Sequence, residues 1–399
     1  MIGERIRQAR LVRRLTLNDV VERLKGMGKS ISKQSLSNYE KNKRTPLPST
    51  LILLGSALSV KPSYFMAEPQ VSITWAAYRC QSRLGKRPRA EIEAYAQSVA
   101  ERQMYLQTTL FPNEPARLPE RRKVESGEEA EEAAADLRAC WQLGNDPIDS
   151  LTQTIENNAG IVVMYPMGDV RFDGLAGYVN KGFPLIVVNE DVPDDRLRFD
   201  LGHELGHLVM DTEGLEPKQE ERLAHRFAGA LLAVREAVFQ ELGTQRARLN
   251  LNELALLKRK YGLSMQALLF RMRDLSIISD YTFQAAFKEF NYRGWRKKEP
   301  VGFNGNEEPT RLEQLTLRAL AEGIITPWEA EELCPGCTAS GETEEPKPGG
   351  ASLPSEFLKI EKSERSRLMA GASKMAEKAY QENPDLNDFE AFGEDDLLD

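Results

Sequence analysis

Residues 201–210 read LGHELGHLVM, and this stretch decides how the rest of the chain is interpreted. It contains His203 and His207, two of the three histidines in the 399-residue chain, with Glu204 between them. Residues four apart lie on one face of an α-helix, so both imidazoles can point at one ion. Two neutral imidazoles supply half of the tetrahedral ligand set that Zn²⁺ prefers. The spacing therefore predicts a zinc site on a helix.

Glu204 is displaced around this helix from the line that joins the two histidines. It cannot easily bind the same ion, but it can reach a water at the open position of the metal. A carboxylate in that place is the general base of a zinc protease. Apolar residues on both sides predict a buried helix, which argues against two incidental histidines on an exposed surface. Gly202 and Gly206 are poor helix formers, so we expect another segment to pack closely here.

A third protein ligand is expected on the following helix. The sequence KQEERLAHRFAGALLAV (218–234) offers Glu220, Glu221 and His225 beside an apolar stripe at helical spacing. Glu221 and His225 are four residues apart, so both could face the metal. Spacing alone does not choose between them.

The pattern HELGH followed by E-x-x-A-x-x-FA-x-x-LL resembles the ImmA/IrrE-type zinc metallopeptidases, most strongly over residues 125–240. The resemblance implies a zincin-like α+β domain and a zinc-dependent endopeptidase with a gluzincin-like ligand set. It makes Glu221 the third ligand besides His203 and His207, and leaves His225 beside the ligands or on the surface. The family usually continues LLMP, whereas this chain reads LLAV at 231–234, so the end that faces the substrate can differ. Residues 294–333 resemble an extension seen in members fused to a DNA-binding domain.

The beginning of the chain is strongly basic, although the whole chain has a net charge of −8. Residues 1–46 contain twelve Lys/Arg and four Asp/Glu, a net charge of +8. This asymmetry is typical of a segment that contacts a polyanion. Five short helices are expected over 3–66, with Thr16 and Ser32 as N-caps and with Leu36 and Tyr39 in the core.

Residues 4–24 (ERIRQARLVRRLTLNDVVERL) and 31–65 (ISKQSLSNYEKNKRTPLPSTLILLGSALSVKPSYF) resemble the lambda-repressor-like, or XRE-type, helix-turn-helix domain. In that family the third helix enters the major groove of DNA. The residues expected to face base edges are Lys33, Gln34, Ser35, Ser37 and Asn38. The residues expected at phosphates are Lys41, Lys43 and Arg44. The alternative is a helix-turn-helix kept for protein–protein contacts, against which the local charge argues.

The rest of the chain divides by composition into a multidomain, mainly α protein. We expect an all-α five-helix DNA-binding domain at 1–68, a helical connector and linker at 69–125, an α+β metallopeptidase domain at 126–245, a helical extension at 246–334, and a flexible linker with a disordered acidic tail at 335–399. A small sheet is expected at 160–165, 174–180 and 185–189. Helices are expected over 89–110, 127–143, 193–210 and 218–239.

Cysteine content and hydropathy bear on the compartment. Four cysteines are too few for a disulfide framework, and Cys334 and Cys337 are expected to be incidental thiols. No apolar run approaches the roughly 20 residues needed to cross a bilayer. The basic N-terminus lacks the apolar stretch of a signal peptide. These features predict a cytoplasmic protein without membrane contact.

Together, these patterns predict a DNA-binding regulatory zinc endopeptidase, with double-stranded DNA and a protein substrate, such as a repressor, as partners. The alternative is a non-catalytic helix-turn-helix transcriptional regulator, or an antitoxin-like protein, whose metallopeptidase fold only binds a partner. The intact Glu204 favours the enzyme. A homodimer stays open, as does a toxin-like partner for the acidic tail.

Overall fold

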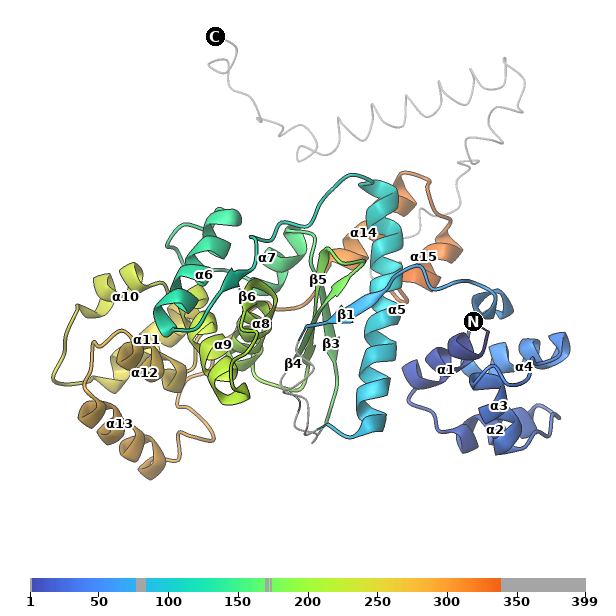
Figure 1. Ribbon diagram of the computed structural model, residues 1–399, viewed down its shortest axis with the longest axis horizontal. Coiled ribbons are helices and arrows are strands. Elements are labelled where there is room, and N and C mark those ends of the chain that lie inside the picture. Colours follow the sequence, from blue (N-terminus) through green and yellow to red (C-terminus); the bar gives the residue numbers. More distant parts are fainter. Residues whose placement is uncertain (1, 77–83, 169–171, 173, 339–399) are drawn as a thin grey trace, which may run out of the picture. The chain divides into compact units, whose positions relative to one another are not determined.

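The computed structural model describes residues 2–76, 84–168, 172 and 174–338. Within them, a mainly helical chain forms an N-terminal helical region and an α+β region with one four-stranded mixed sheet (Figure 1). The predicted linker and acidic tail lie outside the described residues from 339 onward. In these described ranges, no helix is long and apolar enough to cross a membrane.

The N-terminal region consists of four α-helices and a short 3-10 helix. They are α1 (Ile2–Val12), α2 (Leu17–Gly26), α3 (Lys33–Glu40), α4 (Pro48–Leu58) and η1 (Pro62–Phe65). Both predicted N-caps are confirmed, because the hydroxyls of Thr16 and Ser32 accept hydrogen bonds from backbone N–H groups three residues on. Leu36 and Tyr39 are buried in the core of this region, as expected.

An ion pair joins the first and third helices of this region. The guanidinium of Arg10 donates to both carboxylate oxygens of Glu40, over 2.6 and 2.8 Å. Both side chains are largely buried, and a bidentate pair has a defined geometry. The pair therefore fixes the end of α3 against α1.

The sheet has the strand order β1-β4-β5-β3. Its strands are β1 (Ile73–Trp75), β3 (Ile161–Tyr165), β4 (Gly174–Val179) and β5 (Phe183–Asn189). β3 and β5 are parallel, and the other neighbours are antiparallel. The three predicted strands are confirmed. Strand β1 was not predicted, because its three residues are too few for a recognisable alternation.

Helices cover both faces of this sheet (Figure 1). Side chains alternate along a strand, so Leu185 and Val187 of β5 pack in a core with residues of α5 (Lys86–Leu110). Ile186 and Val188 point the other way, into the core that contains α8 (Asp194–Val209). Burial on both faces explains why these strands read as continuous apolar runs.

Three helices and a two-stranded ladder surround α8. They are α6 (Gly127–Cys140), α7 (Leu151–Asn157) and α9 (Pro217–Leu232), with β2 (Arg122–Lys123) and β6 (Met210–Asp211). β2 pairs with β6 in parallel, so the segment predicted as a plain linker contains a strand. The helix expected to run to Phe239 ends at Leu232, because Ala233 leaves helical geometry, and α10 (Arg235–Leu242) begins separately.

The C-terminal part of the described chain is helical. Its elements are α11 (Leu251–Tyr261), α12 (Met265–Asp274), α13 (Asp280–Tyr292), α14 (Arg311–Ala321) and α15 (Pro327–Leu333). Leu254, Leu269 and Phe290 join the same core as α8 and α9. Residues 301–310 are not helical, contrary to expectation. Cys334 and Cys337 lie close together, with 5.6 Å between their Cα atoms.

Candidate metal centre and nucleic-acid interface

Helix α8 carries the HELGH stretch in the interior of the protein. His203, Glu204 and His207 are 8%, 5% and 6% exposed. The predicted close approach at its glycines is confirmed. A Cβ atom on Gly202 would lie 3.3 Å from Ala228 Cβ, and one on Gly206 would lie 3.1 Å from the ring of Phe227. The two glycines thus let α9 pack directly against the helix that carries the histidines.

Three side chains from α8 and α9 bring donor atoms together as a metal ion requires. The Nε2 atoms of His203 and His207 are 3.1 Å apart. Glu221 Oε2 lies 3.4 Å from His203 Nε2, and Glu221 Oε1 lies 3.7 Å from His207 Nε2. Zinc–ligand bonds of ~2.0–2.1 Å at tetrahedral angles place ligand atoms about 3.3 Å apart. The residues therefore fit a zinc-sized ion bound by two imidazoles and one carboxylate.

Within the described ranges, the group of His, Cys, Asp and Glu side chains able to hold a metal is His203, His207 and Glu221. This agrees with the ligand set that the family resemblance implied. His225 is exposed, and its ring lies 4.7 Å from the ring of His203 between centroids. It also stacks on Phe199, at 5.8 Å and 22°. His225 thus lies beside the candidate ligands and not among them.

The residues expected to contact DNA lie on the outward side of α3 and just beyond it. Lys33 and Gln34 are exposed, while Ser35, Ser37 and Asn38 are half-buried. Gln34 Nε2 donates to Asn38 Oδ1 over 3.3 Å, so the two amides form one polar pair. The other expected contacts, all exposed, are Lys41, Lys43 and Arg44. Leu36 and Tyr39 face inward, which leaves the polar side of the helix free for a groove.

Two family models match the chain. Residues 157–273 match the IrrE N-terminal-like domain of the M78 peptidases, and residues 6–65 match a helix-turn-helix domain. The chain carries an IrrE N-terminal-like domain behind a helix-turn-helix domain. The first match contains all three candidate ligands and Glu204, and the second contains α3. No curated protein matches the chain.

Glu220 of the IrrE N-terminal-like domain contacts the candidate ligand His207. Its Oε1 lies 3.5 Å from Nδ1 of His207, on the far side of the ring from the donor Nε2. Burial lowers the pKa of His207. The hydrogen bond with Glu220 and the charges of Glu204 and Glu221 have the larger, opposite effect, so the pKa of His207 lies above its ordinary value. Sequence reasoning considered Glu220 only as a ligand. A carboxylate on the second nitrogen orients a ligating histidine and increases its basicity.

Gly174, the first residue of β4, is a site residue that sequence reasoning missed. A Cβ atom there would lie 2.6 Å from both Cγ and Oε1 of Glu204. Only a residue without a side chain allows the strand to approach this glutamate so closely. The start of β4 therefore limits the positions that the Glu204 carboxylate can adopt. A glycine at the start of a predicted strand was the only signal available in the sequence.

Proposed function

We propose that this chain is a DNA-binding regulatory zinc endopeptidase that cleaves a regulatory protein, such as a repressor. The spacing of 3.1–3.7 Å between the donor atoms of His203, His207 and Glu221 carries the proposal. The match to the IrrE N-terminal-like domain supports a peptidase reaction on the same residues. The helix-turn-helix match supports binding to DNA.

The donor set favours zinc as the metal. Two imidazole nitrogens and one carboxylate oxygen form a ligand set found in catalytic zinc sites, which keep a fourth position open. No cysteine contributes, so the set does not resemble a closed structural site. The three side chains are positioned on α8 and α9, which are packed together at Gly202 and Gly206.

In the proposed reaction, Glu204 handles the proton. A bound zinc ion would supply Lewis acidity toward a water and toward the scissile carbonyl. The Glu204 carboxylate takes a proton from the attacking water and donates it to the amide nitrogen that leaves. Glu204 is 5% exposed, so bulk water competes little for this carboxylate. The start of β4 at Gly174 lies against this carboxylate and limits the positions that it can adopt.

In the proposed DNA complex, α3 enters the major groove. Lys33, Gln34, Ser35, Ser37 and Asn38 would then face base edges, whereas Lys41, Lys43 and Arg44 would contact phosphates. Amide side chains can bond adenine in a bidentate way. The bidentate pair between Arg10 and Glu40 keeps α3 in a fixed orientation for this contact. Which DNA sequence is bound follows from selection on a random duplex library.

The test of the peptidase combines metal analysis with cleavage of a proteome-derived peptide mixture, followed by mass spectrometry. The purified protein is expected to hold one zinc ion and to cleave peptides. Glu204→Gln should retain zinc and lose cleavage, because only the proton acceptor is removed. Cleavage retained by this variant would contradict the mechanism.

A pair of variants tests the third ligand. Glu221→Ala is expected to lose zinc, while His225→Ala retains it, since His225 lies outside the ligand group. Both residues lie on α9 at half-buried or exposed positions, so the two changes make similar demands on folding. Loss of zinc in the His225 variant alone would overturn the ligand assignment.

A further inference from the structure

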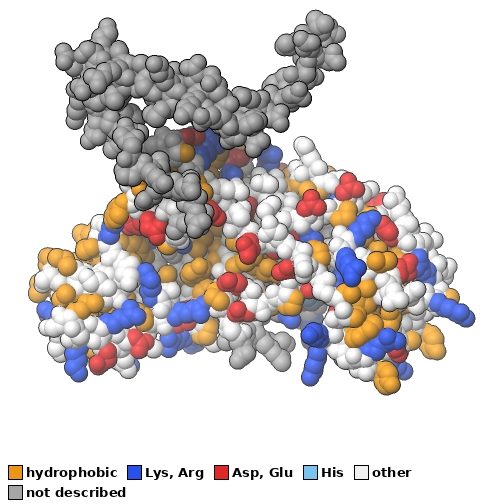
Figure 2. Space-filling model, turned by 180° about the vertical axis from the view of Figure 1, so that it is seen from behind, with side chains coloured by type: hydrophobic (Ala, Val, Ile, Leu, Met, Phe, Trp, Pro, Cys, Tyr) orange, Lys and Arg blue, Asp and Glu red, His pale blue; other side chains and the backbone are white. Residues whose placement is uncertain are grey.

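The candidate metal centre opens into a cavity of about 1470 Å³ with an unequal charge lining. Eight Lys or Arg and six Asp or Glu residues line it, and two of the six acids are Glu204 and Glu221. Outside the metal centre, cationic residues thus outnumber acidic ones by eight to four. On the face shown in Figure 2, Lys/Arg and Asp/Glu side chains are intermixed.

The four remaining acids already have cationic partners. The ion pairs are Asp195 and Glu299 with Lys258 (2.8 Å each), Asp200 with Arg196 (3.5 Å) and Asp274 with Arg226 (3.4 Å). Carboxylates held in this way contribute little negative potential to the cavity. The net charge of the lining is therefore set by the cations that have no such partner.

Four exposed cations of the lining form no ion pair with any residue that the structure describes: Lys218, Arg222, Arg296 and Lys297. Lys218 and Arg222 lie in the first turns of α9, on either side of the candidate ligand Glu221. Arg296 and Lys297 follow α13 and line another part of the same cavity. A chain bound at the metal would pass within reach of these cations.

Aromatic side chains accompany the cations. Phe270 of α12 lines the cavity and is 44% exposed, with its ring supported edge-on by Phe283 and Phe287. Phe199 and Trp295 are half-buried and line the cavity too. An exposed aromatic ring held by others is a preformed apolar contact for a ligand. The lining therefore combines cations with apolar surfaces.

We propose that this cavity selects protein segments with acidic residues and a large apolar residue near the scissile bond. The inference rests on the proposed peptidase function and specifies its substrate class. A volume above the ~300–1,000 Å³ that is usual for small-molecule sites suits several residues of an extended peptide. Aromatic contacts inside a concave site suit a peptide better than duplex DNA, whose phosphates lie on a broad convex surface. Opposite charges steer the segment and set its orientation.

The test uses the zinc-loaded full chain and a peptide library of random sequence with uniform length. Sites cleaved by the wild-type protein should show Asp and Glu enriched near the scissile bond. The variant Lys218→Gln/Arg222→Gln/Lys297→Gln, which keeps Arg296, should show a weaker enrichment, and its rate on acidic peptides should fall roughly fivefold to tenfold, the effect expected of a few solvated ion pairs. Its rate on neutral peptides should fall much less than its rate on acidic peptides.

A control variant, Lys123→Gln/Lys260→Gln/Arg318→Gln, removes the same charge from exposed positions outside the cavity. It should keep the enrichment. Cleavage by the wild-type protein without a preference for Asp or Glu overturns the proposal. An equal loss in the control variant also overturns it, because the effect would then come from net charge alone.

Binding distinguishes this proposal from the peptidase function on which it rests. The Glu204→Gln protein, loaded with zinc, is mixed with the same library, and the retained peptides are sequenced. Acidic peptides retained without any cleavage by the wild type would support the cavity preference and contradict the peptidase. Binding of a short DNA duplex that is lost only in the variant Lys218→Gln/Arg222→Gln/Lys297→Gln would overturn the proposal. The cavity would then bind nucleic acid.

Discussion

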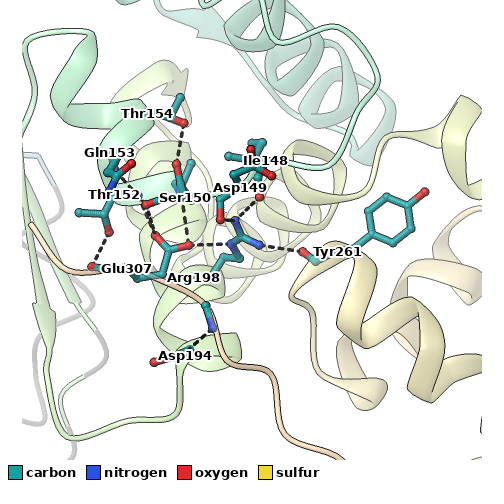
Figure 3. A network of polar contacts seen from close by, with 12 residues as sticks. Ile148, Asp149, Ser150, Thr152, Gln153, Thr154, Asp194, Arg198, Tyr261 and Glu307 are labelled. Atoms are coloured by element: carbon teal, nitrogen blue, oxygen red, sulfur yellow. Dashed lines mark hydrogen bonds and ion pairs between the residues drawn. The ribbon is translucent and has the colours of Figure 1, made fainter. Parts of the chain in front are cut away.

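Arg198 of the IrrE N-terminal-like domain and Glu307, which lies beyond that domain, form a buried ion pair 109 residues apart in the sequence, with 2.8 Å between Arg198 Nε and Glu307 Oε1. Both side chains are only 1% exposed. Glu307 also accepts hydrogen bonds from the backbone N–H groups of Leu151 and Thr152, at the start of α7. Figure 3 shows Glu307 between Arg198 and Thr152. The pair therefore joins α8, α7 and the non-helical segment before α14. On α8, Arg198 lies five residues before His203.

Removing one partner of this pair should destabilise the domain strongly. Arg198→Met leaves the Glu307 carboxylate buried without its cation, which costs about 3–5 kcal/mol of unfolding free energy. The double variant Arg198→Met/Glu307→Gln should recover part of this loss, because no unpaired charge remains. Urea unfolding of the single and double variants measures the coupling. Additive effects of the two changes would contradict the close interaction.

Gly174→Ala should impair catalysis while leaving metal binding intact. The added Cβ would collide with Glu204 at 2.6 Å, and the carboxylate must move to relieve the contact. A proton acceptor displaced by about 1 Å can cost on the order of 100-fold in rate. The measurements are peptide cleavage and zinc content. Gly182→Ala is the control, because a Cβ there meets nothing within 4 Å; equal activity of the two variants would contradict the role of Gly174.

Glu220→Ala should weaken zinc binding although Glu220 is not a candidate ligand. Loss of its contact with His207 Nδ1 leaves the ring less firmly oriented. Loss of such outer contacts typically lowers metal affinity about 10–100-fold. Competition with a chromophoric chelator measures the affinity. Glu213→Ala, at an exposed position in the preceding loop, is the matched control and should bind zinc as the wild type does.

Glu156 should make the domain less stable as the pH rises. Burial raises the pKa of Glu156 to about 7 from 4.5, although backbone N–H groups of Thr310 and Arg311 donate to it and lower the pKa. The folded state therefore holds a proton that the unfolded chain releases near pH 4.5. The contribution of protonated Glu156 to the free energy of unfolding is complete below pH 4.5. It is lost as the pH rises toward 7, a change of about 3 kcal/mol.

Glu156→Gln tests this contribution, because a glutamine can accept the same two hydrogen bonds without a charge. The variant should gain stability over the wild type as the pH is raised from 4.5 to 8, in urea unfolding at each pH. Glu308→Gln, at an exposed position on the same segment as Thr310, should follow the wild-type curve. A constant difference between the Glu156 variant and the wild type across this range would contradict the raised pKa.

The sequence predicted what depends on local spacing. His203, Glu204 and His207 lie within one and a half helical turns, so the period of the helix alone places them, and the N-caps Thr16 and Ser32 act within three residues. The contacts that were missed join distant segments. Neither the approach of Gly174 to Glu204 nor the pair of Arg198 with Glu307 follows from a local period. The two residues of each pair are far apart in the sequence, and only tertiary packing brings them together.

The break between α9 and α10 was missed for another reason. The apolar stripe of 218–239 continues at helical spacing through Ala233 and Val234, so the pattern contains no stop signal. In the fold, Ala233 is fully buried and its carbonyl accepts a hydrogen bond of 2.8 Å from Nε of Arg271 in α12. A tertiary contact thus occupies a carbonyl at the point where the helix ends.

The proposed DNA interface separates into residues expected to read bases and residues expected to bind phosphates. Lys43→Gln removes one expected phosphate contact and should weaken binding to all duplexes alike. The slope of log affinity against log salt should fall in magnitude by about one.

Gln34→Ala should leave this slope unchanged, but it should cost about 1–3 kcal/mol of binding free energy on the preferred sequence and broaden the specificity. Lys123→Gln, outside the helix-turn-helix match, is the control for lost charge and should change neither quantity. Fluorescence anisotropy over a salt series, on a duplex selected from a random library and on an unrelated one, measures both effects. Wild-type binding that does not weaken with added salt would contradict the basic surface on α3 and the residues beyond it.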